Sequence, residues 1–100
     1  MKYREQIKEA EEMIALSVVN AQLNLGARVQ SVKIVEKEVE LAQETYRMVD
    51  EQYKSNLASI NDVLDALTEL EKTNFKYQEA VYNQRQAITA LLHAKGTLSY

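Results

Sequence analysis

The sequence predicts an all-α protein built as a long antiparallel helical hairpin, and three observations support this prediction. The 100 residues include no proline and only two glycines, so few positions break a helix. Charged residues make up 27% of the chain, and alanine, leucine, glutamate, glutamine and lysine are abundant, as in long helices and coiled coils. Apolar residues recur with helical spacing on both sides of one short interruption near the middle, where the chain must turn back.

A first helix is expected over residues 3–53. Its inward seam consists of two rows with heptad spacing, whose members are apolar or tyrosine with the exception of one arginine. The rows are Leu25, Val32, Val39, Tyr46 and Tyr53, and, three residues further on, Arg28, Val35, Ala42 and Val49. The pattern extends back through Ile7, Ile14, Val18 and Ala21, although residues 1–12 are otherwise dense in charge.

A turn is expected over residues 54–59 and a second helix over residues 60–95. Ser59 is a favourable N-cap, and Asp62 occupies the third helical position, where a carboxylate also favours the positive end of the helix dipole. Lys95 followed by Gly96 is typical of a helix end, because glycine tolerates the left-handed conformation. A chain of this length forms one domain, a single hairpin over residues 1–100.

The second helix is expected to present two rows to the first helix. They are Ile60, Leu67, Asn74, Val81 and Ile88, and, offset by three, Val63, Leu70, Tyr77, Gln84 and Leu91. Most members are apolar, and the polar members Asn74 and Gln84 could define the register of the pairing at some cost in stability.

Further apolar rows lie outside these seams. They are Ala27, Ile34, Leu41 and Met48 on the first helix, and Ala66, Thr73, Ala80, Ala87 and Ala94, together with Phe75 and Tyr82, on the second. One hairpin buries one seam of each helix, so a second seam indicates neighbours on two sides. We therefore expect the isolated chain to self-associate, as a four-helix dimer. The alternative is that wide apolar faces are ordinary in compact bundles.

Composition and charge exclude several functional classes. A net charge of −3 argues against nucleic-acid binding, and the absence of cysteine excludes disulfides and thiolate metal sites. No apolar run approaches the roughly 18 residues that a membrane span needs, which predicts a soluble chain. His93 is the sole histidine, and a contact with the helix C-terminus is its simplest role. We expect no metal site, because the chain has neither a cysteine nor a second histidine. We also expect no cofactor, and no catalysis, because a slim hairpin offers no concave pocket for paired carboxylates.

The stretch from Tyr53 onward carries a more specific pattern. It reads Tyr53-x-x-Asn56-x-x-Ser59-x-x-Asp62-Val63-Leu64-x-Ala66, continues with Leu70, Tyr77, Ala80, Tyr82 and Leu91, and ends Ala94-Lys95-Gly96-Thr97-Leu98. In this order and spacing the residues resemble the TolC-like outer-membrane efflux protein family. The resemblance covers residues 40–98, whereas residues 13–39 match only as a generic heptad helix.

The resemblance implies a trimeric channel whose periplasmic half is a barrel of antiparallel helices, with a strand barrel in the outer membrane. This chain would be one hairpin of the helical barrel, in which helices contact neighbours on both sides. The strand segments, the second hairpin and the signal peptide of such a channel are not in the sequence. We therefore expect the chain to be a segment of a longer protein.

Two carboxylates match the family's acidic positions near the tip. Asp62 and Asp65 correspond to residues that in some members face the lumen at the pore entrance. Three copies of this pair, one helical turn apart, would concentrate negative potential there and favour cations. The alternatives are the N-terminal cap for Asp62 and an ordinary solvated aspartate for Asp65.

The turn itself matches the tip that docks a periplasmic adaptor protein, over Ser55, Asn56, Leu57, Ala58 and Ser59. Leu57 is a candidate docking contact or, alternatively, a hydrophobic cap against Tyr53. Tyr53 matches a tyrosine that can hydrogen-bond across hairpins, or is a heptad core residue. Asn56 replaces the usual turn glycine and tolerates the left-handed conformation. Ala58 stands where some members carry a basic residue, so a closing salt bridge from that position is not expected.

A second functional hypothesis remains beside the channel segment. The chain could be a stand-alone cytoplasmic helical-hairpin module for protein–protein interaction, with a coincidental resemblance at the tip. A parent reading frame with a signal peptide, strand segments and a second related hairpin would distinguish the channel from the module.

Overall fold

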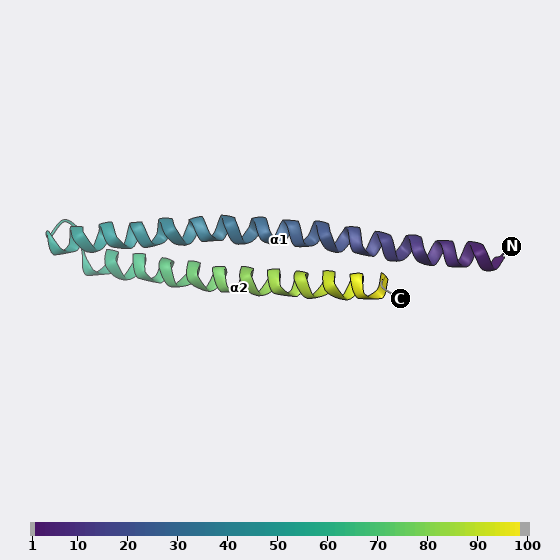
Figure 1. The fold of residues 1–100 in the computed structure, drawn as a ribbon. Coiled ribbons are helices and arrows are strands. Elements are labelled where there is room, and N and C mark those ends of the chain that lie inside the picture. The colour runs from purple at the N-terminus through teal and green to yellow at the C-terminus, as the bar shows by residue number, and fades with distance from the viewer. Residues whose placement is uncertain (1, 99–100) are drawn as a thin grey trace. The chain divides into compact units, whose positions relative to one another are not determined.

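The protein is an all-α helical hairpin, as the sequence predicts. A computed structural model describes residues 2–98, and the side chains of residues 4–96. Helix α1 spans Lys2–Lys54 and helix α2 spans Ile60–Leu98, with the tip between them (Figure 1). Among the described residues there is no strand.

The predicted stop at Gly96 is wrong, because α2 continues to Leu98. A glycine ends a helix by adopting a positive φ, which turns the chain away from the helix axis. Neither glycine has a positive φ, so Gly96 keeps the helical conformation. The first helix, α1, ends at Lys54, one residue after the predicted end at residue 53.

Contacts divide the chain into two units, which we describe separately. The tip unit comprises Ser31–Tyr82, and therefore the C-terminal part of α1, the tip and the first part of α2. The distal unit combines the N-terminal part of α1, up to Gln30, with α2 from Asn83 onward. In the tip unit the two helices run antiparallel and side by side (Figure 1).

In the tip unit, the seam of α1 follows the predicted heptad. Val35 is buried, and most other members of the seam are half-buried: Val32, Val39, Ala42, Tyr46 and Val49. Tyr53, the last member of the predicted seam, is exposed, so its alternative role as a heptad core residue is wrong. Opposite them on α2, Val63 is buried and Leu70 and Tyr77 are half-buried. These rows have the spacing of a coiled-coil interface, which keeps the same helix face inward over successive turns.

The inward face of α2 agrees with the prediction in one row and only in part in the other. The row that begins at Val63 is buried or half-buried throughout, whereas in the row of Ile60 only Leu67 and Val81 are half-buried, and Ile60, Asn74 and Ile88 are exposed. The row of small residues, which was assigned to a second seam, is instead the most buried part of α2: Ala66 and Ala94 are half-buried, and Thr73, Ala80 and Ala87 are buried. Small side chains let a helix approach its neighbour closely, so packing favours this row.

Thr73 is the buried polar member of that row, and its burial leaves no hydrogen bond unmade. Its hydroxyl donates to the backbone carbonyl of Glu69 at 2.7 Å. A satisfied hydroxyl avoids the cost of desolvating an unpaired polar group, so the threonine serves as a small core residue.

The distal unit has a thinner core. Val18 and Ala87 are buried, while the surrounding seam residues are half-buried: Ile14, Ala21, Leu25, Leu91 and Ala94. Every described side chain from residue 4 to residue 13 is exposed. The first turns of α1 therefore make no core.

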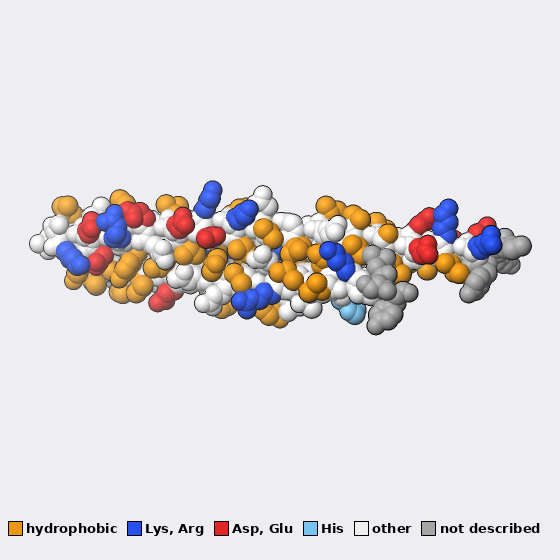
Figure 2. All heavy atoms as spheres, in the orientation of Figure 1, with side chains coloured by type: hydrophobic (Ala, Val, Ile, Leu, Met, Phe, Trp, Pro, Cys, Tyr) orange, Lys and Arg blue, Asp and Glu red, His pale blue; other side chains and the backbone are white. Residues whose placement is uncertain are grey.

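Large apolar side chains remain at the surface of the tip unit, between acidic and basic ones (Figure 2). On α1 they form a heptad row that we call the α1 outer row, namely Ile34, Leu41 and Met48. On α2, Phe75 and Tyr82 are exposed one heptad apart. Because none of the described side chains is fully buried, much of the apolar surface of the hairpin lies outside its own core.

Candidate functional site at the tip and the adjacent groove

The tip begins with a regular end to α1. Asn56 has φ 61°, in the left-handed region, which confirms the role expected for this residue in place of glycine. The N–H of Asn56 donates to the carbonyl of Tyr53 at 3.0 Å, and the N–H of Leu57 donates to the carbonyl of Gln52 at 2.7 Å. These two bonds are those of a Schellman motif, which satisfies the last carbonyls of a helix.

Helix α2 begins with a capping box. The Ser59 hydroxyl accepts a hydrogen bond from the N–H of Asp62 at 3.2 Å, and the Asp62 carboxylate accepts one from the N–H of Ser59 at 3.0 Å. The pair satisfies two amide groups that the first helical turn leaves without partners. The predicted N-cap at Ser59 is confirmed.

The two candidate pore carboxylates therefore have different surroundings. Asp62 and Asp65 are both exposed and lie three residues apart, on neighbouring positions of the helix surface. Asp62 participates in the capping box, whereas the carboxylate of Asp65 makes no hydrogen bond or ion pair with the described residues. A local structural role accounts for the position of Asp62 but not for that of Asp65.

Leu57 lies at the surface of the tip, with 79% of its area exposed. It borders a shallow hollow together with Met48, Gln52 and Ser55, whereas Tyr53 does not line that hollow and is itself exposed. A hydrophobic cap would remove Leu57 from water, so the alternative of a cap against Tyr53 does not describe its surroundings. Of the other docking candidates, Ser55 is exposed and Ala58 is half-buried.

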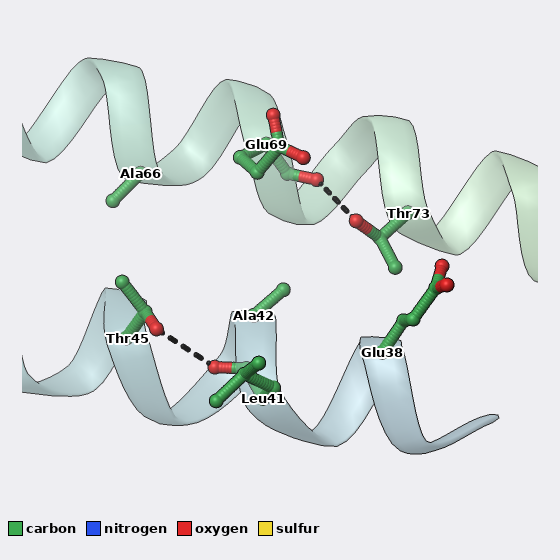
Figure 3. Close-up of a pocket in the computed structure, with 7 residues that line it drawn as sticks. All are labelled: Glu38, Leu41, Ala42, Thr45, Ala66, Glu69 and Thr73. Carbon is green, nitrogen blue, oxygen red and sulfur yellow. Dashed lines mark hydrogen bonds between the residues drawn. The ribbon is translucent and has the colours of Figure 1, made fainter. Parts of the chain in front are cut away.

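A groove that the sequence did not predict lies between the helices of the tip unit. It has a volume of about 260 Å³ and is lined by Glu38, Leu41, Ala42 and Thr45 of α1 and by Ala66, Glu69 and Thr73 of α2 (Figure 3). Small side chains form its floor, while 69% of the Leu41 side chain is exposed. The heptad row that contains Leu41 was visible in the sequence, but its juxtaposition with Ala66 and Thr73 depends on how the helices pack.

One ion pair joins the two helices next to this groove. The Lys76 ammonium lies 3.0 Å from the Glu38 carboxylate, and the two side chains are 60% and 43% exposed. Exposed pairs of this kind contribute little to stability. The ion pair is informative about geometry, because it shows that residues 38 and 76 lie opposite each other, at the same height along the two helices.

A second cluster of charges lies on α1 alone. Arg47 donates to Glu44 through Nε at 3.2 Å and through Nη2, and to Glu51 through Nη1 at 2.9 Å. These interactions hold the pKa of the Glu44 carboxyl below its ordinary value, chiefly through the hydrogen bond, and raise the pKa of Arg47. Lys54 pairs with Asp50 at 3.1 Å. All of these pairs join residues of one helix, so they support α1 rather than form a binding site.

The described part of the chain contains no group of three or more His, Asp or Glu side chains arranged to hold a metal ion. No described helix is long and apolar enough to cross a membrane.

Comparisons with known proteins place the chain in no family. No protein-family model, no curated protein and no solved structure matches it.

Proposed function

We propose that this chain is an assembly segment of a TolC-like outer-membrane efflux or secretion channel, namely one hairpin of its periplasmic helical barrel. The observation that carries the proposal is the presence of exposed apolar rows on both helices of one hairpin. The α1 outer row and the pair of Phe75 and Tyr82 are too large and too regular for a surface that only meets water. A hairpin in a ring of helices contacts neighbours on both sides.

The tip supports the same role. The Schellman motif and the capping box define the conformation of the turn from both sides, and Leu57 stands exposed at its surface. A rigid turn with an exposed leucine suits a contact with another protein. In the proposed channel, that partner is the periplasmic adaptor, and Ser55, Asn56, Ala58 and Ser59 complete the contact surface.

Asp65 is the better candidate for the pore entrance. Three copies of the chain would bring three Asp65 carboxylates around one axis, and their summed potential would attract cations. Asp62 adds to this potential, but its capping role gives it a second reason to be present.

The experiment has a genetic and a functional part. The reading frame around these 100 codons should encode a signal peptide, strand segments and a second related hairpin, and a frame without them would exclude the channel. In the whole protein, Asp65→Asn should reduce the preference for cations in single-channel recordings, with Glu71→Gln on the same helix as the control. Unchanged selectivity for Asp65→Asn would mean that this carboxylate does not line the pore.

The alternative is a stand-alone helical-hairpin interaction module. The same exposed rows favour it, because they require a partner but do not identify one. Such a module would be encoded without the channel segments, so the reading frame decides between the two functions.

A further inference from the structure

The groove face of the tip unit is incomplete in a single chain. Along this face the three members of the α1 outer row, Ile34, Leu41 and Met48, are 59%, 69% and 49% exposed. Burial of such aliphatic side chains is favourable, so a partner that covers the row would gain stability from it.

The groove face carries both a projecting row and a hollow. Leu41 stands at the rim with most of its side chain exposed, and the floor beside it is formed by Ala42, Ala66 and Thr73. The hollow of about 260 Å³ is larger than the roughly 150 Å³ cavity that accommodates benzene, so it can receive an aliphatic side chain. A face with a projection next to a recess can pack against a copy of itself, as an isologous interface requires.

We propose that this face joins two copies of the chain in an antiparallel dimer, with a two-fold axis at the level of Leu41 and Thr73. These two residues line the same groove, and the neighbouring Glu38–Lys76 ion pair confirms the level. The axis places Leu41 beside its own equivalent. It also places Ile34 of one copy opposite Met48 of the other, because both lie seven residues from Leu41.

The charges on α2 agree with the same axis. Glu69 and Lys76 lie one heptad apart, on the same row, and the midpoint between them falls next to Thr73. Reversing α2 against its copy at this level brings Glu69 of each chain toward Lys76 of the other. One axis therefore places the apolar row beside its own copy and sets Glu69 of each chain near Lys76 of the other, whose ammonium also pairs with Glu38 of its own chain. This reciprocal contact favours a second copy as the occupant.

The dimer does not depend on the proposed channel role. In that channel all hairpins point the same way, whereas the two copies here point in opposite directions. A reading frame without channel segments would exclude the channel and leave the dimer intact, and a monomeric chain would exclude the dimer and leave the channel intact.

The first test compares two matched substitutions by sedimentation equilibrium of the full chain. Leu41 and Phe75 are equally exposed, at 69% and 70%. Phe75 lies two residues from Thr73, which rotates it by about 200° around α2, away from the groove. Leu41→Glu should weaken the dimer at least about 100-fold, because two leucines lose their apolar contacts and two carboxylates meet. Phe75→Glu should leave the dimer unchanged.

The second test measures the geometry. The chain contains no cysteine, so a single introduced cysteine is the only thiol available for crosslinking or labelling. Leu41→Cys should form an intermolecular disulfide under mild oxidation, and Phe75→Cys should not. Spin labels on Lys54→Cys should lie roughly 40 Å apart, since Lys54 is thirteen residues along α1 from the axis.

Three results would overturn the proposal. They are a wild-type chain that stays monomeric at 100 µM protein, equal loss of the dimer in the two glutamate variants, and Lys54 labels within about 20 Å of each other, which would mean that the tips lie together. Because both substituted side chains are exposed, unchanged circular dichroism should accompany each variant. Mixing Glu69→Lys with Lys76→Glu should restore a dimer that each variant weakens alone, and failure to restore it would exclude the charge pairing.

Discussion

The capping box gives a sharp prediction, because it distinguishes the two carboxylates that follow the tip. Replacing Asp62 with alanine removes the acceptor for the Ser59 N–H, which it binds at 3.0 Å, and removes a negative charge from the positive end of α2. The lost hydrogen bond and the lost charge–dipole interaction are each modest at an exposed position, and together they should lower the free energy of unfolding by about 1 kcal/mol. Ser59→Ala removes the reciprocal bond of 3.2 Å and should cost a similar amount.

Asp65→Ala is the matched control. It makes the same chemical change one turn further along α2, so the higher helix propensity of alanine enters both variants equally and cancels in their difference. Asp65 has no capping partner, and its replacement should change stability by less than about 0.5 kcal/mol. The difference between the two variants therefore isolates the capping contribution.

The assay is urea denaturation followed by circular dichroism at a constant protein concentration, because association would otherwise change the apparent stability. With an m-value of roughly 2 kcal/mol per molar urea, a change of about 1 kcal/mol shifts the urea midpoint by about 0.5 M, which is readily measured. If Asp62→Ala were no more destabilising than Asp65→Ala, the capping box would not stabilise the hairpin. Asp62 would then be explained by function alone.

Three further predictions follow from single sites. Asn56→Ala should lower the free energy of unfolding by about 1 kcal/mol, and Asn56→Gly should not, because alanine strains the left-handed backbone at φ 61°; equal stabilities of the two variants in urea would contradict the Schellman motif. Ala87→Leu should destabilise by about 1–3 kcal/mol through overpacking, since Ala87 is only 3% exposed, whereas Ala90→Leu at an exposed position should be nearly neutral in the same assay. In an NMR titration, Arg47→Gln should raise the lowered pKa of Glu44 toward its ordinary value. Because that pKa is depressed in the folded state, the contribution of the pair is present above the ordinary carboxyl pKa and is lost as pH falls through the depressed value; an unchanged Glu44 titration would exclude Arg47 as the cause.

The features of the hairpin that depend on neighbouring residues could be predicted from the sequence. Ser59 and Asp62 are three residues apart, and the bonds around Asn56 span at most five residues, so their chemistry is visible in a short window. The α1 seam was equally clear, because Val32, Val35, Val39 and Ala42 follow the alternating spacing of three and four residues that a heptad repeat requires.

Which second row of α2 faces inward could not be predicted in this way. Apolar rows lie on both sides of the row of Val63, and the rows of Ile60 and Ala66 each hold four apolar residues out of five, so only the larger side chains of the Ile60 row favoured it. The structure selects the small row, because the choice depends on how closely two helix backbones can approach. The distance between the two helix backbones depends on the side chains of both helices, so the sequence of one helix does not determine it.

The sequence by itself determined that the chain forms two helices, where they turn and how the turn is capped, since these follow from contacts within one or two helical turns. Only the tertiary structure decided which second row of α2 is buried and which apolar rows remain exposed. The row of alanines and Thr73 packs against α1, and its small side chains leave a groove between the helices that no side chain of the hairpin fills. Leu41 lies at the rim of this groove and is exposed. Burial is shared between residues distant in the chain, so the surface available to a partner appears only once both helices are in place.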